Sequence, residues 1–276
     1  MKYLQEILFE KKKEIKKLKK THILDDKTGT PLCYCERPGK SLVKNIDRSK
    51  VNVIAEIKRA SPSSGVINDA VDIKKMALLY ERYSSFVKGI SILTEPIYFK
   101  GNLSDIEKVK EVTNLPILRK DFIFHEEQVY ESLKAGANCI LLISSILGTR
   151  KLKKLYQLGK KLGLDVLVEV HSFDELDRAF DIGAEFIGIN NRNLKNMKVD
   201  HEVTVGILDY ANKRAKRYIK EKIFVCESGI EDIGYIKRVF EKGVSTFLIG
   251  GYFMRSKNTD ETLATMEKVL KKEFLI

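Results

Sequence analysis

The strongest constraint on the fold is an alternation that begins at Asn52 and continues to the C-terminus. Short apolar runs rich in β-branched residues alternate with amphipathic segments of roughly 10 to 15 residues, a pattern typical of βαβ units on a parallel sheet. Eight such runs predict a closed (β/α)8 barrel, an α/β fold. The predicted strands span residues 53–57, 89–93, 117–120, 139–143, 166–170, 186–190, 223–227 and 246–250.

The amphipathic segments between these runs are the predicted barrel helices. Gly136, Gly183 and Gly243 each stand a few residues before a strand, as expected of glycines that end helices. Nothing in the pattern indicates a second catalytic domain, and 276 residues suit a single barrel. The predicted helices span residues 69–83, 103–112, 126–135, 149–162, 173–182, 203–211, 233–241 and 259–274.

Residues 1–50 are predicted to form an additional N-terminal helix and a connector packed on the barrel of residues 51–276. In residues 1–20 an apolar stripe repeats at helical spacing, and the lysines lie mostly outside it. Such a helix can bind a membrane or nucleic acid, but packing on the barrel is favoured. The connector should contain a short helix at 41–46 and carries Cys33 and Cys35, which with His22 would be the ligands of any metal site. The stripe consists of Leu4, Ile7, Leu8, Ile15 and Leu18.

The formal net charge of +12 would suit nucleic acid, an anionic membrane or a phosphorylated substrate. The lysines are spread over the predicted helices without a basic and aromatic cluster, which indicates solvated helix faces. We therefore expect no nucleic-acid or membrane partner. No stretch approaches the roughly 20 apolar residues needed to span a bilayer, the N-terminus lacks a cleavable signal pattern, and the four cysteines form no regular framework. These features predict a cytoplasmic protein.

Ionisable residues at the ends of the predicted strands give the first indication of function. Barrel strands are buried on both faces, so a charged side chain there is costly unless it serves a site at the carboxyl ends of the strands. The period of two places Glu56 and Lys58 on one face and Ile57 on the other. Some of these groups could instead be salt bridges that close the barrel top. The side chains predicted to converge at one mouth are Glu56, Lys58, Lys120, Glu169, Asn190 and Glu227.

The loops after the seventh and eighth strands predict a phosphate site. Residues 227–230 and 250–255 follow these strands, and the second segment can start a short helix. Their glycines allow the backbone to approach a phosphate closely. The residues thus predict a phosphate-binding barrel enzyme with lysine and glutamate acid–base chemistry, and they leave the substrate open.

Segments along the whole predicted barrel resemble the indole-3-glycerol phosphate synthases of tryptophan biosynthesis. Each segment alone is weak, but together they follow the family's order and are highly specific. The N-terminal helix also resembles the family's extra helix. The matching segments are 53–65 (VIAEIKRASPSSG), 91–95 (SILTE), 98–101 (YFKG), 116–122 (PILRKDF), 167–171 (LVEVH), 187–194 (IGINNRNL), 226–230 (CESGI) and 248–250 (LIG).

The resemblance implies a substrate and an order of chemistry. The substrate would be 1-(2-carboxyphenylamino)-1-deoxyribulose 5-phosphate, converted to indole-3-glycerol phosphate, carbon dioxide and water without a metal or organic cofactor. Lys120 would protonate the ribulose carbonyl oxygen as the aromatic carbon attacks, and Lys58 would lie near the substrate carboxylate. A lysine among other cations would have a lowered pKa, which suits proton transfer near neutrality. Glu169 would serve the later dehydration.

The resemblance also implies supporting and binding roles. Glu56 would orient the lysines, Asn190 would position a substrate hydroxyl or the reacting amine, and Glu227 would support this network. Arg192 would brace the mouth. Gly251 stands where family members usually carry a side chain, which removes one contact and keeps the backbone donor. Phosphate contacts carry over to Ser61, Ser228, Gly229, Gly250 and Gly251, and the anthranilate wall to Pro62, Phe99, Phe122 and Leu194, for which ordinary core packing is an equal alternative.

Three other interpretations stay open. A phosphoribosylanthranilate isomerase is the nearest, but Lys120 and the N-terminal helix argue against it. A nucleic-acid-binding protein would use the net charge, and an inactive scaffold would keep only the fold. As partners of the enzyme we expect the sugar-phosphate substrate and weak contacts with other tryptophan-pathway enzymes, and we expect the chain to be a monomer.

Overall fold

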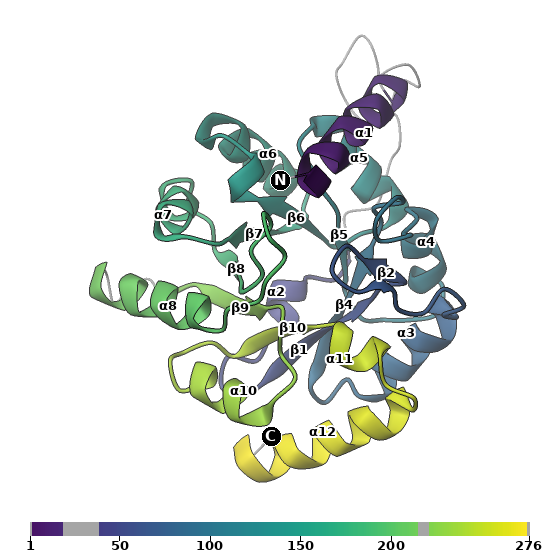
Figure 1. Ribbon diagram of the computed structural model, residues 1–276, viewed down its shortest axis with the longest axis vertical. Helices are drawn as coiled ribbons and strands as arrows, with labels where there is room; N and C mark the ends of the chain where they lie inside the picture. Colours follow the sequence, from purple (N-terminus) through teal and green to yellow (C-terminus); the bar gives the residue numbers. More distant parts are fainter. Residues whose placement is uncertain (1, 19–38, 215–220, 275–276) are drawn as a thin grey trace.

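The computed structural model describes residues 2–18, 39–214 and 221–274, and its central element is a closed barrel of parallel strands (Figure 1). The strands follow the order β1-β10-β9-β8-β7-β6-β5-β4 around the barrel, and the predicted (β/α)8 fold is confirmed. Each predicted boundary of a strand lies within two residues of the observed one. The barrel strands are β1 (Asn52–Ile57), β4 (Val87–Leu93), β5 (Ile117–Lys120), β6 (Cys139–Ile143), β7 (Asp165–Val170), β8 (Phe186–Asn190), β9 (Ile223–Glu227) and β10 (Thr246–Ile249).

Helices surround the barrel on the outside (Figure 1). Gly136, Gly183 and Gly243 have φ angles of +91°, +77° and +98°, so their predicted role as helix stops is confirmed. The first of these helices starts four residues later than predicted, because the Asp72 side chain accepts the N–H of Lys75 and caps it there. The barrel helices are α3 (Ile73–Arg82), α4 (Ser104–Lys110), α5 (Glu126–Ala135), α6 (Thr149–Lys161), α7 (Phe173–Asp181), α8 (Glu202–Arg214), α10 (Ile233–Phe240) and α12 (Thr259–Phe274).

Several short elements complete the described chain. The two predicted short helices are present as α2 and α11, and Cys33 and Cys35 lie outside the described residues. None of the described helices combines the length and the apolar character that crossing a bilayer requires. These elements are α1 (Lys2–Leu18), α2 (Leu42–Asn45), the hairpin of β2 (Ala60–Ser61) and β3 (Gly65–Val66), η1 (Ser144–Ile146) and α11 (Gly251–Met254).

Alternation along the strands separates two apolar layers. The outer layer lies between strands and helices and contains Ala55 and Val168. The inner layer fills the barrel and contains Ile54 and Leu167, so residues two positions further along, Glu56 and Glu169, continue the inward face. Burial of each large apolar side chain stabilises the fold by about 1.5–3 kcal/mol. The inner layer comprises Ile54, Leu118, Cys139, Leu141, Ile143, Leu167, Phe186, Ile223, Val225 and Leu248.

Helix α1 lies beside α5 at the outer edge of the barrel (Figure 1). Ile7 and Ile15 are buried as the stripe predicts. Ile7 and Phe122 belong to one buried apolar cluster with the inner layer, here called the inner cluster. Lys11 departs from the expected pattern, because it stands between these isoleucines and is only 3% exposed. Its ammonium group therefore needs a partner inside the protein.

Candidate active site

A cavity lies at the carboxyl ends of the strands, and its empty space amounts to about 1010 Å³ when the open solvent at its mouth is included. This is where barrels of this kind place their sites. Every site residue predicted from the sequence lines it, although this placement alone does not test the role of any of them. The predicted residues in the lining are Glu56, Lys58, Ser61, Pro62, Phe99, Phe122, Lys120, Glu169, Asn190, Arg192, Leu194, Glu227, Ser228, Gly229, Gly250 and Gly251.

Both lysines in the cavity are paired with carboxylates. Lys120 Nζ lies 2.7 Å from Glu169 Oε2 and 3.0 Å from Glu227 Oε2, joining β5 to β7 and β9. Lys58 Nζ lies 2.7 Å from Glu56 Oε1, two residues away in the chain. The carboxylates are at most 6% exposed in their side chains, so these pairs are screened little by solvent.

The expectation that neighbouring cations lower the pKa of the acidic lysine is wrong for Lys120. Burial alone would lower the pKa of Lys120, but the charges of Glu169, Glu227 and Glu56 outweigh burial and raise that pKa well above its ordinary value. Lys120 therefore carries its proton at neutral pH. The sequence had suggested cations because it showed two lysines, but the inward faces of β7 and β9 bring carboxylates to Lys120 instead.

The pKa values of the two carboxylates beside Lys120 are shifted in opposite directions. Burial favours the neutral form of Glu169, but Lys120 and His171 outweigh it and hold the pKa of Glu169 well below its usual range. Burial and the charge of Glu169 raise the pKa of Glu227 to about 8, against the effect of Lys120. Glu169 thus favours its ionised form, and Glu227 keeps a proton to higher pH than an ordinary carboxyl group, a separation that suits one base and one acid.

Two inward-facing glycines make room for the carboxylates. A Cβ atom at Gly188 would lie 2.0 Å from Glu227 Oε1, and one at Gly250 would lie 2.4 Å from Glu56 Oε1. Any larger residue would displace these side chains. The sequence gave no sign of this role, because the contact joins neighbouring strands.

The mouth of the cavity is formed by the loops after β8, β9 and β10. Arg192 donates from Nη1 to the Met197 carbonyl oxygen at 2.8 Å, and its backbone N–H donates to Asn190 Oδ1 at 2.9 Å. After β9, Ser228 and Gly229 have φ angles of +69° and +74°. Such angles favour glycine and expose the backbone of a tight turn. This loop therefore presents main-chain groups to the cavity.

The loop after β10 carries a cation that the sequence did not single out. Arg255 lies at the end of α11, and its Nη1 would be 2.7 Å from a Cβ atom at Gly251. The guanidinium thus occupies the space beside the missing side chain of Gly251. Arg255 also pairs with Glu231 in the preceding loop, and both residues line the cavity.

Aromatic side chains form one wall. The rings of Phe99 and Phe122 are 6.5 Å apart between centroids, and both line the cavity. Phe122 also belongs to the inner cluster, so this side chain both lines the cavity and packs in the core. Phe99 is held by Glu95, whose buried carboxylate accepts the backbone N–H groups of Ile97, Tyr98 and Phe99 at 2.7–3.0 Å.

Comparison with known proteins identifies the family. The family model described as indole-3-glycerol phosphate synthase matches residues 4–266. The chain belongs to the indole-3-glycerol phosphate synthase family. The synthase of Campylobacter jejuni subsp. jejuni is 39% identical over 261 residues, which cover 94% of this chain and 98% of that protein. The synthase of Caldanaerobacter subterraneus subsp. tengcongensis is 42% identical over 256 residues, 91% and 93% of the two chains.

Solved structures that are more distant in sequence share the fold of this indole-3-glycerol phosphate synthase family member. A thiamine phosphate pyrophosphorylase from Pyrococcus furiosus aligns with a TM-score of 0.56 and 12% identity over 82% of this chain and 98% of that one. An N-acetylmannosamine-6-phosphate 2-epimerase from Clostridium perfringens gives 0.54 and 16%, over 80% and 91%. At these identities the likeness concerns the barrel alone. Membership of the family makes the chain a carbon–carbon lyase of tryptophan biosynthesis.

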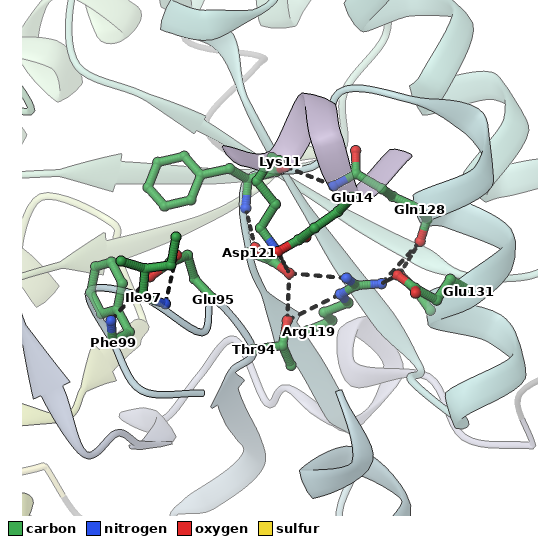
Figure 2. A network of polar contacts seen from close by, with 12 residues as sticks. Lys11, Glu14, Thr94, Glu95, Ile97, Phe99, Arg119, Asp121, Gln128 and Glu131 are labelled. Atoms are coloured by element: carbon green, nitrogen blue, oxygen red, sulfur yellow. Dashed lines mark hydrogen bonds and ion pairs between the residues drawn. The ribbon is translucent and has the colours of Figure 1, made fainter. Parts of the chain in front are cut away.

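Asp121, which also lines the cavity, joins a polar network that sequence analysis missed (Figure 2). Its Oδ2 accepts Lys11 Nζ at 3.0 Å, Thr94 Oγ1 at 2.6 Å and Arg119 Nη2 at 2.9 Å. Its Oδ1 accepts the backbone N–H of Phe122 at 2.8 Å. Asp121 thereby fixes the backbone directly after Lys120. Its position in the segment shared with the synthases was the only sequence signal available.

Proposed function

We propose that the cavity binds 1-(2-carboxyphenylamino)-1-deoxyribulose 5-phosphate and converts it to indole-3-glycerol phosphate, carbon dioxide and water. The observation that carries the proposal is the placement of Lys120 between Glu169 and Glu227 inside a cavity with glycine-rich loops at its mouth. This arrangement supplies an acid, a base and main-chain donors for a phosphate. Side chains alone carry out the chemistry, without metal or organic cofactor.

Ring closure uses the proton on Lys120. The aromatic carbon that bears the substrate carboxylate attacks the ribulose carbonyl carbon, and Lys120 gives its proton to the carbonyl oxygen as the new carbon–carbon bond forms. The raised pKa keeps Lys120 protonated before this step, so Lys120 can act as the acid. Lys58, oriented by Glu56, pairs with the substrate carboxylate until it leaves as carbon dioxide.

Dehydration uses the carboxylates. Once carbon dioxide has left, Glu169 takes a proton from the ring carbon next to the nitrogen and passes it to the hydroxyl group, which leaves as water and so completes the indole ring. Glu169 is ionised and buried, which suits it to accept that proton. Asn190 orients the substrate through its amide, and Glu227 keeps Lys120 and Glu169 in place and holds one proton of its own.

Binding groups surround the reacting centre. We place the phosphate against Ser61, Ser228, Gly229, Gly250 and Gly251, where backbone N–H groups can donate to its oxygens. Phe99, Phe122, Pro62 and Leu194 wall the anthranilate ring, and Arg192 closes the mouth. We further propose a cytoplasmic monomer that binds this small sugar phosphate, makes weak contacts with other enzymes of the pathway, and has no nucleic-acid or membrane partner.

The test is direct formation of indole. Purified protein is incubated with the carboxyphenylamino-deoxyribulose phosphate while indole fluorescence is followed, and the chain contributes no background from tryptophan because it has none. The proposal expects a signal that depends on enzyme concentration and is absent with phosphoribosylanthranilate as substrate. Folded protein that forms no indole would overturn it.

A further inference from the structure

Glu169 is contacted by a second nitrogen besides Lys120. His171 Nε2 lies 3.3 Å from Glu169 Oε1, on the opposite oxygen from Lys120. The other imidazole nitrogen, Nδ1, lies 3.2 Å from Glu175 Oε2. Glu175 Oε2 also accepts the backbone N–H of His171 at 2.9 Å, which fixes the ring relative to α7. A carboxylate at each nitrogen favours a proton on both.

The surroundings of His171 are built to keep it charged. Its side chain is 14% exposed, and it lies at the end of β7 behind Glu169 rather than in the cavity lining. The charged groups facing it are Glu169 on β7 and Glu175 on α7, with Lys120 and Glu227 beyond Glu169. The adjacent η1 carries no titratable side chain. Burial opposes a charge on the ring, but the two carboxylates outweigh it and raise the pKa of His171 to about 9.

We propose that His171 is a positioning residue, an imidazolium clamped between Glu175 and Glu169 that keeps Glu169 ionised and aimed at Lys120. This inference rests on the proposed function and adds to it a residue that never touches the substrate. Its importance follows from the order of steps. When Lys120 gives its proton to the substrate oxygen it becomes neutral, and Glu169 loses that positive neighbour before dehydration begins. Among the described residues, His171 then supplies the remaining cation in contact with Glu169.

The decisive variant is His171→Gln. Glutamine keeps a neutral N–H donor near the position of Nε2 and removes the positive charge. The ionised form of Glu169 should therefore be less stabilised. We expect kcat to fall at least about tenfold with a much smaller change in KM, because substrate contacts stay intact. Loss of the cation raises the pKa of Glu169, so the acidic limb of the kcat–pH profile should move to higher pH.

A second variant separates the two contacts. Glu175→Gln leaves the ring beside Glu169 but removes the carboxylate at Nδ1, so the imidazolium loses its proton at lower pH. The alkaline limb of the kcat–pH profile should therefore move to lower pH. His125→Gln is the matched control, since His125 contacts Glu126 and Glu127 outside the cavity. Neither limb should move in that variant.

A spectroscopic measurement tests the charge without relying on turnover. Nitrogen NMR of the wild type should show the His171 ring protonated on both nitrogens at pH 7.5, and a neutral ring would overturn the inference. A His171→Gln enzyme with an unchanged pH profile would also overturn it, whether kcat falls or not, because a structural defect lowers activity without moving a pKa. A wild type that forms no indole would instead remove the proposed function.

Discussion

Lys11 Nζ lies 3.0 Å from Asp121 Oδ2, across 110 positions of the chain (Figure 2). Lys11 is 3% exposed and Asp121 is 2% exposed. Asp121 and Glu14 compensate the charge of Lys11, and Lys11 and Arg119 compensate the charge of Asp121. The pair ties α1 to the residue that directly follows Lys120. Helix α1 is therefore joined to the barrel by a buried charge as well as by its apolar stripe.

We predict that Lys11→Met destabilises the protein by about 2 kcal/mol. Breaking a buried ion pair typically costs about 3–5 kcal/mol, and the remaining contact between Arg119 and Asp121 reduces this. The free energy of unfolding in urea measures the effect. Lys12→Met, at an exposed position of the same helix, is the control. Equal losses in the two variants would show that the buried pair contributes no stability.

The same pair predicts a dependence of stability on pH. Burial alone would raise the pKa of Asp121, but Lys11, Arg119 and Thr94 lower it to about 2, below its ordinary value of 3.8. A lowered carboxyl pKa contributes stability that is present above the unfolded value and lost as pH falls through the folded one. This contribution is about 2 kcal/mol at neutral pH.

The measurement is the difference in unfolding free energy between the wild type and Asp121→Asn as a function of pH. The difference should be constant above about pH 5 and shrink as pH falls from about 4 toward 2. A difference that stays level across that window would contradict the low pKa of Asp121.

The acid and base assigned above predict large catalytic losses. Lys120→Ala removes the proton donor of ring closure, and Glu169→Gln removes the proton acceptor of dehydration. Each is expected to lower kcat by at least ~100-fold with the fold retained. Indole formation measures turnover, and circular dichroism checks the fold. Turnover like that of the wild type in either variant would exclude the role assigned to that residue.

A fourth prediction concerns the space beside Glu227. Gly188→Ala would place a methyl group 2.0 Å from Glu227 Oε1, so the carboxyl group must move away from Lys120. We expect kcat to fall at least about tenfold with only a small change in unfolding free energy, because the displaced atoms end a flexible side chain. Gly206→Ala in α8, where a Cβ would meet nothing within 4 Å, should leave kcat unchanged. If the kcat of Gly188→Ala equals that of the control, turnover does not depend on the present position of the Glu227 carboxyl group.

Sequence reasoning succeeded where backbone geometry alone decides the outcome. The period of two along a strand places Glu56 two residues beyond Ile54 on the inward face, and the closed barrel brings the strand ends together. Gly136 ended its helix as expected because few other residues adopt its φ of +91°. No knowledge of distant contacts was needed for these predictions.

It failed where the partner lies far away in the chain. Lys11 occupies the middle of the stripe, four residues from both Ile7 and Ile15, and its spacing could have marked it as buried. Nothing local indicates that Asp121 is the partner. The pKa of Lys120 was assigned the wrong direction for the same reason, since the sign depends on which side chains face it across β7 and β9.

The contact between α1 and β5 also orders the assembly of the site in time. Chains are synthesised at about 5–20 residues per second, so Lys11 emerges at least about 5 s before Asp121 exists. Until β5 joins the barrel, this lysine and its flanking isoleucines have no buried surface to occupy. The buried pair beside Lys120 can therefore form only after β5 has been synthesised, long after the helix that supplies its lysine.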